Sequence, residues 1–542
     1  MVSSPSNVNH LEPAQSELSE ISGKRTKELI EWLRDYAQRR INSRLMDERR
    51  CITPNIVLDF GKQGLLGMIV PESQGGLGLT YHDMLKIIEQ CAGIDLNLSS
   101  FVAVHNVLGI YPILKYGTKE QKEKYLNCLA QGRDLAAFGL TEPDAGSNPR
   151  GIKTEAIPDG KDGWLMSGTK IWIGTASWSS VINVFAQVVD EQGKSLGVTA
   201  FAIPENAKGL KQGHEFLTIG MRGMVQNAIH FDQVTVSSEN ILGEIGNGFE
   251  VAQDAMRLGR LAIAAMCVGG MKRCAQLMLR YASRRSLGVD KLIHKPITLE
   301  RLSDLTAAIG AVECLVKTMS QWLDQDIPVP EEAFLTAKII APELMWQAAD
   351  QLVQLLGGRG YIESNIAPQI LRDARVMRIF EGPTETLQAR LGLLALYYAP
   401  KLCSSLNELL GVSNINIELN KAVDFCKAQI NTQNLSKEDK QALRQIYQQK
   451  LGDLVSWAFM LACLQKSNRN ESTDEQKRIE KWTEEHFRAK LSTILQESPL
   501  KSTLLSETQV ESLIEKYIET IGDVEQTLPG ENTELDEYLL KY

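Results

Sequence analysis

An excess of basic residues is missing from this sequence. The chain has 58 Lys and Arg residues against 67 Asp and Glu residues, which gives a formal net charge of −9 over 542 residues. Binding to nucleic acid relies on clustered cations that face phosphate groups, so the charge balance argues against a nucleic-acid-binding protein. Hydrophobic residues make up 43% of the chain and charged residues 23%, which is typical of a folded globular protein.

Long apolar runs are also missing. The longest strongly apolar stretch covers residues 261–271, between Arg260 and Lys272, whereas a membrane-spanning helix needs about 20 apolar residues. The first residues show neither the basic region nor the apolar segment of a secretion signal. We therefore expect no membrane span and a cytoplasmic location.

The residues that bind metals are not clustered. The nine cysteines are scattered, without a Cys-x-x-Cys pair, and the seven histidines form no group with them. This distribution is typical of reduced thiols in a protein core, and it predicts no metal site.

The common glycine motifs for phosphate binding are missing as well. No Gly-x-Gly-x-x-Gly follows a predicted strand. The segment from Gly163 through Gly168 to Lys170 places Thr before Lys, the reverse of the phosphate-loop order, and it alternates like a strand. A nucleotide cofactor must therefore be held in some other way.

Changes of hydrophobic periodicity divide the chain into four regions. A chain of this length exceeds one hydrophobic core, since a domain has about 100–200 residues. The regions are a helical N-terminal domain over 1–133, a strand-rich middle domain over 134–242, a helical domain over 243–400 and an additional helical domain over 401–542. Because helices and strands are segregated rather than alternating, the fold class is α+β.

Caps, glycines and prolines mark the later helices. The expected helices cover residues 247–285, 297–324, 331–356, 367–377, 436–464, 475–495 and 507–521. The segment 457–464 is apolar almost all round, which predicts that it is buried. We expect the additional region to have a small core of its own.

Four segments in order carry a family signal. They are 138–148, 168–173, 354–361, and Arg372-Asp373 followed by 379–382. In this order and spacing they resemble the acyl-CoA dehydrogenase family, over about residues 18–398. The resemblance implies a middle β-barrel and a C-terminal four-helix bundle, with FAD between them and a second subunit closing the site. We expect a homodimer.

The resemblance also implies a reaction, the α,β-dehydrogenation of an acyl thioester on CoA or on an acyl carrier protein. A base takes the α proton while the β hydrogen leaves as hydride to the flavin, and electrons pass on to an electron-transfer flavoprotein or to oxygen. The base must be a carboxylate in a dry pocket, where its pKa rises toward neutrality. Glu381 matches the family's base. Some relatives carry the base one residue before the match to Arg260, where this chain has Gly259.

The other matches are binding residues. The resemblance implies FAD contacts at Phe138, Leu140, Thr141, Gly146, Ser147, Trp172, Ile173, Gly174, Arg284, Gln354, Gly357, Gly358, Pro383 and Glu385. It implies substrate contacts at Ser147, Arg257, Arg260, Glu381 and Gly382. Arg285 is an open alternative to Arg284 as the arginine for the FAD pyrophosphate.

Some positions depart from the family pattern. Gly174 stands where the family has a Thr beside the flavin, so Thr175 or a backbone N–H is expected to replace it. Pro383 replaces another Thr and removes a backbone donor. The chain is therefore a diverged member, and three alternatives stay open: an acyl-CoA oxidase, a flavin monooxygenase, or a non-catalytic assembly protein.

Overall fold

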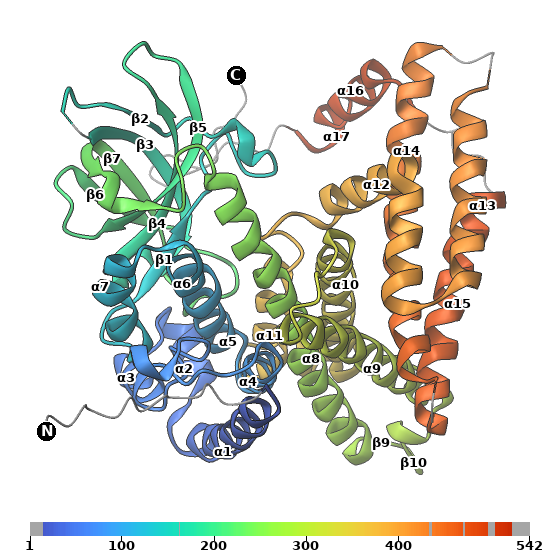
Figure 1. The fold of residues 1–542 in the computed structure, drawn as a ribbon. Helices are drawn as coiled ribbons and strands as arrows, with labels where there is room; N and C mark the ends of the chain where they lie inside the picture. Colours follow the sequence, from blue (N-terminus) through green and yellow to red (C-terminus); the bar gives the residue numbers. More distant parts are fainter. Residues whose placement is uncertain (1–14, 162, 433–435, 470–471, 497–504, 523–542) are drawn as a thin grey trace, which may run out of the picture.

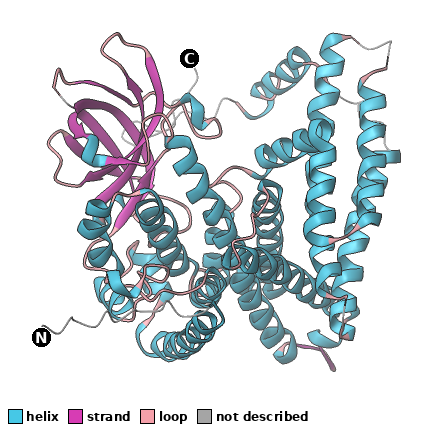
Figure 2. Ribbon diagram, viewed as in Figure 1, coloured by secondary structure: helices cyan, strands magenta, loops and turns pink. Residues whose placement is uncertain are grey.

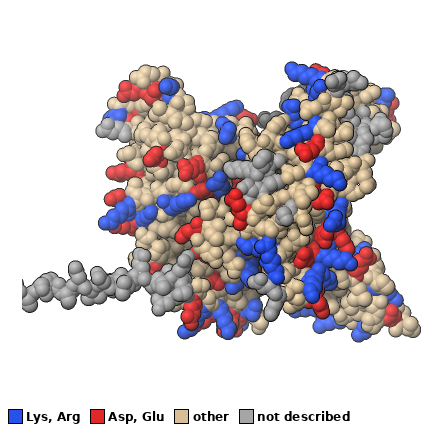
Figure 3. All heavy atoms as spheres, turned by 45° about the vertical axis from the view of Figure 1, so that its right-hand side comes forward, with Lys and Arg blue, Asp and Glu red and all other residues tan. Residues whose placement is uncertain are grey.

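The structure is a computed structural model, and it describes residues 15–161, 163–432, 436–469, 472–496 and 505–522. Figures 1 and 2 show one strand-rich region, which lies above the N-terminal helices, and a large helical region beside both. Charges of both signs are intermixed on the face that Figure 3 shows.

The N-terminal region is helical, as predicted. Its helices are α1 (Gln15–Arg40), α2 (Ser43–Arg49), α3 (Pro54–Lys62), α4 (Tyr81–Ile94), α5 (Leu96–Ala103), the π-helical η2 (Val104–Ile110), α6 (Tyr111–Tyr116) and α7 (Lys119–Ala130). The capping box expected at Thr118 and Gln121 begins α7, because each side chain accepts from the other residue's backbone N–H.

One helical segment of this region is apolar enough to cross a membrane by length and composition. It runs over Leu96–Tyr116, and 83% of its apolar window is buried inside the protein. Asn106 lies within it and donates to the carbonyl groups of Leu65 and Val102, both at 2.9 Å. Burial of this extent is typical of a core helix, and the sequence analysis had singled out the stretch 261–271 instead.

The middle region is a single mixed sheet. Its strands are β1 (Ala136–Gly139), β2 (Glu155–Pro158), β3 (Gly163–Gly174), β4 (Val181–Val189), β5 (Ser195–Pro204), β6 (Leu210–Glu215), β7 (Gln226–Ser237) and β8 (Ile241–Leu242). They run in the order β6-β7-β3-β2-β4-β5-β8, and β1 pairs with β4. Within the described residues β6 and β8 do not pair with each other, so the sheet is open and the predicted β-barrel is not confirmed.

The third region is a helical bundle. It contains α8 (Gly248–Arg284), α9 (Pro296–Asp324), α10 (Glu331–Leu356), α11 (Ile366–Val376) and α12 (Thr384–Ser405). The first four agree with the predicted spans to within one residue at each end. The fifth crosses the predicted boundary at residue 400, with a kink at Tyr398.

The additional helices join this bundle. They are η8 (Leu406–Leu410), α13 (Ser413–Ile430), α14 (Lys437–Ser467), α15 (Asp474–Gln496), α16 (Glu507–Glu515) and α17 (Ile518–Ile521). Helices α12 and α14 cross at two glycines: a Cβ at Gly392 would lie 1.7 Å from the Gln448 carbonyl oxygen, and one at Gly452 would lie 1.9 Å from that of Gln388.

The buried side chains of this region confirm part of the expectation and correct the rest. Residues 457–464 are buried, as predicted, but they belong to the same hydrophobic cluster as the bundle and the N-terminal helices. The expectation of a separate small core was wrong, because α14 packs directly on α12, α10 and α9.

Candidate active site

Glu381 lies where the chain turns between two helices. Helix α11 ends at Val376 and α12 begins at Thr384, so the residue sits at the break that the sequence indicated. Its backbone is left-handed, with φ at 57°, and the following Gly382 has φ at 105°. A left-handed glutamate is uncommon and costs about 1–3 kcal/mol, so the surrounding structure must hold this turn.

The carboxylate of Glu381 faces α8. A Cβ placed on Gly259 would lie 3.1 Å from Oε1 and 3.3 Å from Cδ of Glu381, so only the absence of a side chain at residue 259 makes room for the carboxylate. Oε2 of Glu381 is buried and has no hydrogen-bond partner among the described residues. A buried acceptor without a donor is costly unless a ligand meets it. The side chain therefore points into a protected site and not into bulk solvent.

Two cations hold the backbone of this turn. Arg260 Nε donates to the Glu381 carbonyl oxygen at 3.2 Å, and Lys338 Nζ donates to that of Gly382 at 3.1 Å. Burial raises the pKa of Glu381 to about 7, and Arg260 and Lys338 act in the opposite direction. A carboxylate with a pKa near neutrality suits a general base.

The two ends of the same turn are held by α10, the helix that also carries Lys338. Glu343, on α10, accepts from Arg378 Nε at 2.6 Å and from the Thr384 hydroxyl at 2.8 Å. The turn that carries Glu381 is therefore fixed from α8 and from α10.

The predicted flavin strand lies beside the end of β3. Phe138 is in β1 and packs on Phe185, with ring centroids 4.9 Å apart, and Leu140 is buried. Ile171 N donates to the Thr141 carbonyl oxygen at 2.9 Å. Gly146 and Ser147 follow in an exposed turn. The backbone at Thr141 is thus hydrogen-bonded to β3 at Ile171, next to Trp172.

Lys170 is buried on this strand and pairs with Glu142 at 2.7 Å. The segment that superficially resembled a phosphate loop is part of β3, and its lysine has a structural partner.

The end of β3 is strained and partly open. Trp172 has φ at 57° and its side chain is 57% exposed, so it is not a core tryptophan. Ile173 is buried. A Cβ on Gly174 would lie 3.2 Å from Met224 Cε, which leaves little room for the Thr that the family carries there. The Thr175 hydroxyl donates to its neighbour's carbonyl, that of Gly174, at 2.7 Å.

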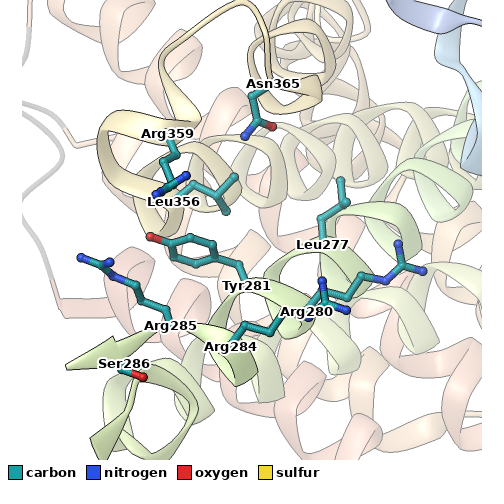
Figure 4. Close-up of a pocket in the computed structure, with 9 residues that line it drawn as sticks. All are labelled: Leu277, Arg280, Tyr281, Arg284, Arg285, Ser286, Leu356, Arg359 and Asn365. Carbon is teal, nitrogen blue, oxygen red and sulfur yellow. The ribbon is translucent and has the colours of Figure 1, made fainter. Parts of the chain in front are cut away.

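A pocket rich in arginine lies at the other end of α8 (Figure 4). It has a volume of about 680 Å³, and its lining residues are Leu277, Arg280, Tyr281, Arg284, Arg285, Ser286, Leu356, Arg359 and Asn365. None of its four arginines forms an ion pair with another described residue. The pocket suits an anion such as a pyrophosphate, because Arg presents several fixed donors.

The predicted residues Gln354, Gly357 and Gly358 adjoin this pocket in sequence. Gln354 is exposed at the end of α10, and Gly357 has φ at 58°, a conformation that favours glycine. Arg284 and Arg285 both line the pocket, so the structure does not choose between them.

The arginine pocket and Glu381 are far apart in one chain. Gly259 touches Glu381 and Arg284 lines the pocket, and the 25 residues of helix between them span about 37 Å. The sequence-predicted residues therefore form two separate groups in each copy of the protein.

The matched segment Arg372-Asp373 has mainly structural contacts. Asp373 is 1% exposed and accepts from Met221 N at 2.6 Å and from Asn97 Nδ2 at 3.1 Å. Arg372 pairs with Asp47 at 2.5 Å. This motif joins the N-terminal helices, the middle region and the bundle.

The remaining predicted residues lie at or near the protein surface or in an ion pair on α8. Arg257 pairs with Asp254 at 2.9 Å on α8, Pro383 is half-buried and Glu385 is exposed at the start of α12. Within the described residues no group of His, Cys, Asp and Glu could hold a metal ion.

The sequence analysis missed Lys338 and Glu343. A signal for Lys338 exists, since this lysine is the only charged residue in the helical stretch over 333–342. No such signal marks Glu343, because its role depends on where Arg378 and Thr384 lie in space.

Three family models match consecutive parts of the chain. They describe the N-terminal, middle and C-terminal domains of acyl-CoA dehydrogenase and match residues 24–133, 137–234 and 246–392. The short-chain specific acyl-CoA dehydrogenase of Homo sapiens mitochondria is 31% identical over 359 residues, which are 66% of this chain and 86% of that protein.

Longer relatives also match. The very long-chain specific acyl-CoA dehydrogenase of Mus musculus mitochondria is 31% identical over 387 residues, which are 70% of this chain. The match spans 59% of that relative's length. A solved acyl-CoA dehydrogenase of Bacillus anthracis, complexed with FAD, has a TM-score of 0.68 at 22% identity and covers 95% of this chain and 96% of its own, so the likeness of fold extends into the additional helices. From the domain models and the human relative, the chain belongs to the acyl-CoA dehydrogenase family.

Proposed function

We propose that the protein is an FAD-dependent dehydrogenase that introduces a double bond between Cα and Cβ of an acyl thioester. The observation that carries the proposal is the environment of Glu381. Its carboxylate lies beside Gly259, one oxygen is buried without a partner among the described residues, and burial raises its pKa to about 7. A general base that accepts a proton from a substrate needs these properties.

The residues present suit FAD. The exposed indole of Trp172 and the backbone around Phe138, Leu140 and Thr141 offer an aromatic surface and peptide groups for a flavin ring. The arginine pocket offers cations for a pyrophosphate. When bound, FAD supplies the acceptor for the hydride that leaves the β carbon.

The separation of these two groups supports a cofactor shared between two copies. Roughly 37 Å of helix separates Gly259, beside Glu381, from Arg284 in the arginine pocket of the same chain. Arg284, Gln354, Gly357 and Gly358 would therefore hold the cofactor of a second copy, which supports the homodimer as a proposal.

The protein's own part in the reaction follows from the geometry. Glu381 takes the α proton onto its carboxylate, and the pair of electrons left on Cα forms the new π bond as hydride leaves Cβ. Arg260 and Lys338 keep the turn that carries Glu381 in place. Ser147, Arg257 and Gly382 stay predicted substrate contacts.

Anaerobic mixing with acyl-CoA and acyl-carrier-protein thioesters tests the proposal. We expect the visible absorbance of the flavin to bleach with at least one thioester, and Glu381→Gln to bleach roughly 10²–10⁴ times more slowly with FAD still bound. Equal rates in the two proteins would remove Glu381 from the reaction.

The same experiment separates the open alternatives. Rapid reoxidation of the bleached protein by oxygen would indicate an oxidase, and slow reoxidation with fast transfer to an electron-transfer flavoprotein a dehydrogenase. A flavin monooxygenase has no need of a base at residue 381, so the buried carboxylate speaks against it. Purified protein that never takes up FAD would favour an assembly protein. The cytoplasmic location stays a prediction.

A further inference from the structure

A second buried charge lies next to the proposed base. Lys338 is 0% exposed, in the first third of α10, and its helix neighbours Ala337 and Ile339 are buried in the bundle core. Burying an ammonium group is costly unless it is paired with an anion or well hydrogen-bonded. Among the described residues Lys338 forms no ion pair, and its hydrogen bond goes to the Gly382 carbonyl oxygen at 3.1 Å.

The buried ammonium group of Lys338 lies next to the turn that carries the proposed base. Gly382 directly follows Glu381, so the lysine binds the peptide next to the proposed base. The charged and titratable groups that face Lys338 are Cys267 and Arg260 on α8, Glu381 in the turn, and Glu343 on α10. Burial lowers the pKa of Lys338 to about 8, so the side chain is largely charged at neutral pH.

A purely structural role does not require a lysine here. A methionine of similar length would fill the same apolar channel without a charge to desolvate, and such replacements of buried ions are often neutral or stabilising. The Lys338 ammonium group does two things that a methionine cannot: it donates to the turn, and it presents a positive charge to Glu381.

We propose that Lys338 is a positioning residue of the active site, which holds the Gly382 peptide so that Glu381 keeps its left-handed conformation, and whose charge favours the ionised, basic form of the Glu381 carboxylate. The inference rests on the proposed function for its meaning in catalysis. The proposed electrostatic coupling between the two side chains does not depend on whether a thioester reacts.

Three variants separate charge from hydrogen bonding. Lys338→Met removes both, and Lys338→Gln removes the charge but keeps an N–H donor for Gly382. Lys272→Met is the matched control, because Lys272 is in the same bundle but pairs with Glu89 at 2.6 Å and Glu313 at 2.8 Å.

The first measurement needs no substrate. Infrared spectroscopy follows the carbonyl stretch of the protonated Glu381 carboxyl against pH, and the band is assigned by its loss in Glu381→Gln. We expect the protonation midpoint to rise by about one pH unit or more in Lys338→Met and in Lys338→Gln, because a nearby opposite charge has been removed. The midpoint in Lys272→Met should equal that of the wild type. Equal midpoints in all four proteins would overturn the electrostatic part.

The second measurement follows flavin bleaching by a thioester substrate. At about pH 7 both Lys338 variants should be roughly tenfold slower, since a smaller fraction of Glu381 is ionised. At high pH Lys338→Gln should approach the wild-type rate, while Lys338→Met should stay slower because its turn lacks a donor. If Lys338→Met reaches the wild-type rate at high pH, the positioning role is wrong. Wild-type protein that no thioester bleaches would instead contradict the proposed function, and the infrared result would still decide the coupling.

Discussion

Two buried carboxylates, eight residues apart in sequence, behave differently in this molecule. Burial raises the pKa of Glu381 to about 7 and that of Asp373 to about 8. Asp373 accepts from Met221 N and Asn97 Nδ2, one donor on each oxygen, whereas Glu381 Oε2 has no partner among the described residues. A raised pKa therefore does not identify the base. The proposal for Glu381 rests instead on the buried oxygen that has no partner among the described residues.

The surroundings explain this difference. Asp373 lies where three regions meet, and its neighbours Arg372, Asp47 and Asn97 fill that junction. Glu381 lies in a turn whose backbone carbonyl groups, rather than its carboxylate, accept from the cations. Arg260 and Lys338 therefore hold the backbone of this turn, and neither donates to the buried Oε2 of Glu381.

The sharpest test of this comparison is to neutralise each carboxylate. Glu381→Gln should slow flavin bleaching by roughly 10²–10⁴, because the base is lost. Asp373→Asn should leave the rate close to that of the wild type. Anaerobic stopped-flow measurement with one active thioester checks both. A large loss of rate in Asp373→Asn with FAD still bound would contradict a purely structural role for Asp373.

The pH dependence of the rate comes next in size. Glu381 must be ionised to take a proton, and its pKa is about 7. The rate at low substrate concentration should therefore fall about tenfold for each pH unit below the pKa and level off above it. A pH series of single-turnover rates checks this, with buffers that leave FAD bound. A rate that does not change through neutrality would contradict the assignment.

Filling the space beside the carboxylate should give a smaller effect on rate. The added methyl group of Gly259→Ala would lie 3.1 Å from Glu381 Oε1 and displace the carboxylate. We expect a loss of rate of about tenfold, since small displacements of catalytic groups are costly. The helix itself should gain up to about 1 kcal/mol, because Ala is the better helix former. Thermal unfolding measures the expected gain in stability, and flavin bleaching on the same samples measures the expected loss of rate. Unchanged activity would show that the carboxylate does not need the space.

The smallest expected effect concerns stability at Asp373. The pKa of this carboxyl is about 8 in the folded protein, above the ordinary value of about 4. The folded state therefore binds the proton more tightly, and stability falls as pH rises from about 4 to about 8. Asp373→Asn cannot titrate, so it should lose less stability than the wild type over this range. Below about pH 4, where the wild-type carboxyl is protonated in both states, the variant should be about 1–3 kcal/mol less stable, because one buried donor loses its acceptor.

Chemical unfolding at several pH values measures that difference. The two proteins should diverge at acid pH and converge toward alkaline pH. Parallel curves would mean that Asp373 titrates near its ordinary value.

Much of the fold could be predicted because it depends on local patterns. Helices α8 to α11 follow caps, prolines and glycines that act within a few residues, and the predictions agreed to within one residue at each end. The break at Glu381 and Gly382 was visible for the same reason. The expected barrel and the separate C-terminal core depended on contacts between distant residues. The first is not confirmed and the second was wrong, because α14 packs onto α12 through Gly392 and Gly452.

The sequence alone determined that this is an acidic α+β chain with ordered motifs of the acyl-CoA dehydrogenase family and a carboxylate at residue 381. The tertiary structure decided that Gly259 makes room for that carboxylate, that Lys338 lies buried behind it, and that the arginine pocket lies at the far end of α8. The physical reason is range: capping and periodicity act between near neighbours in the chain, whereas burial, charge and shape depend on side chains that only folding brings together.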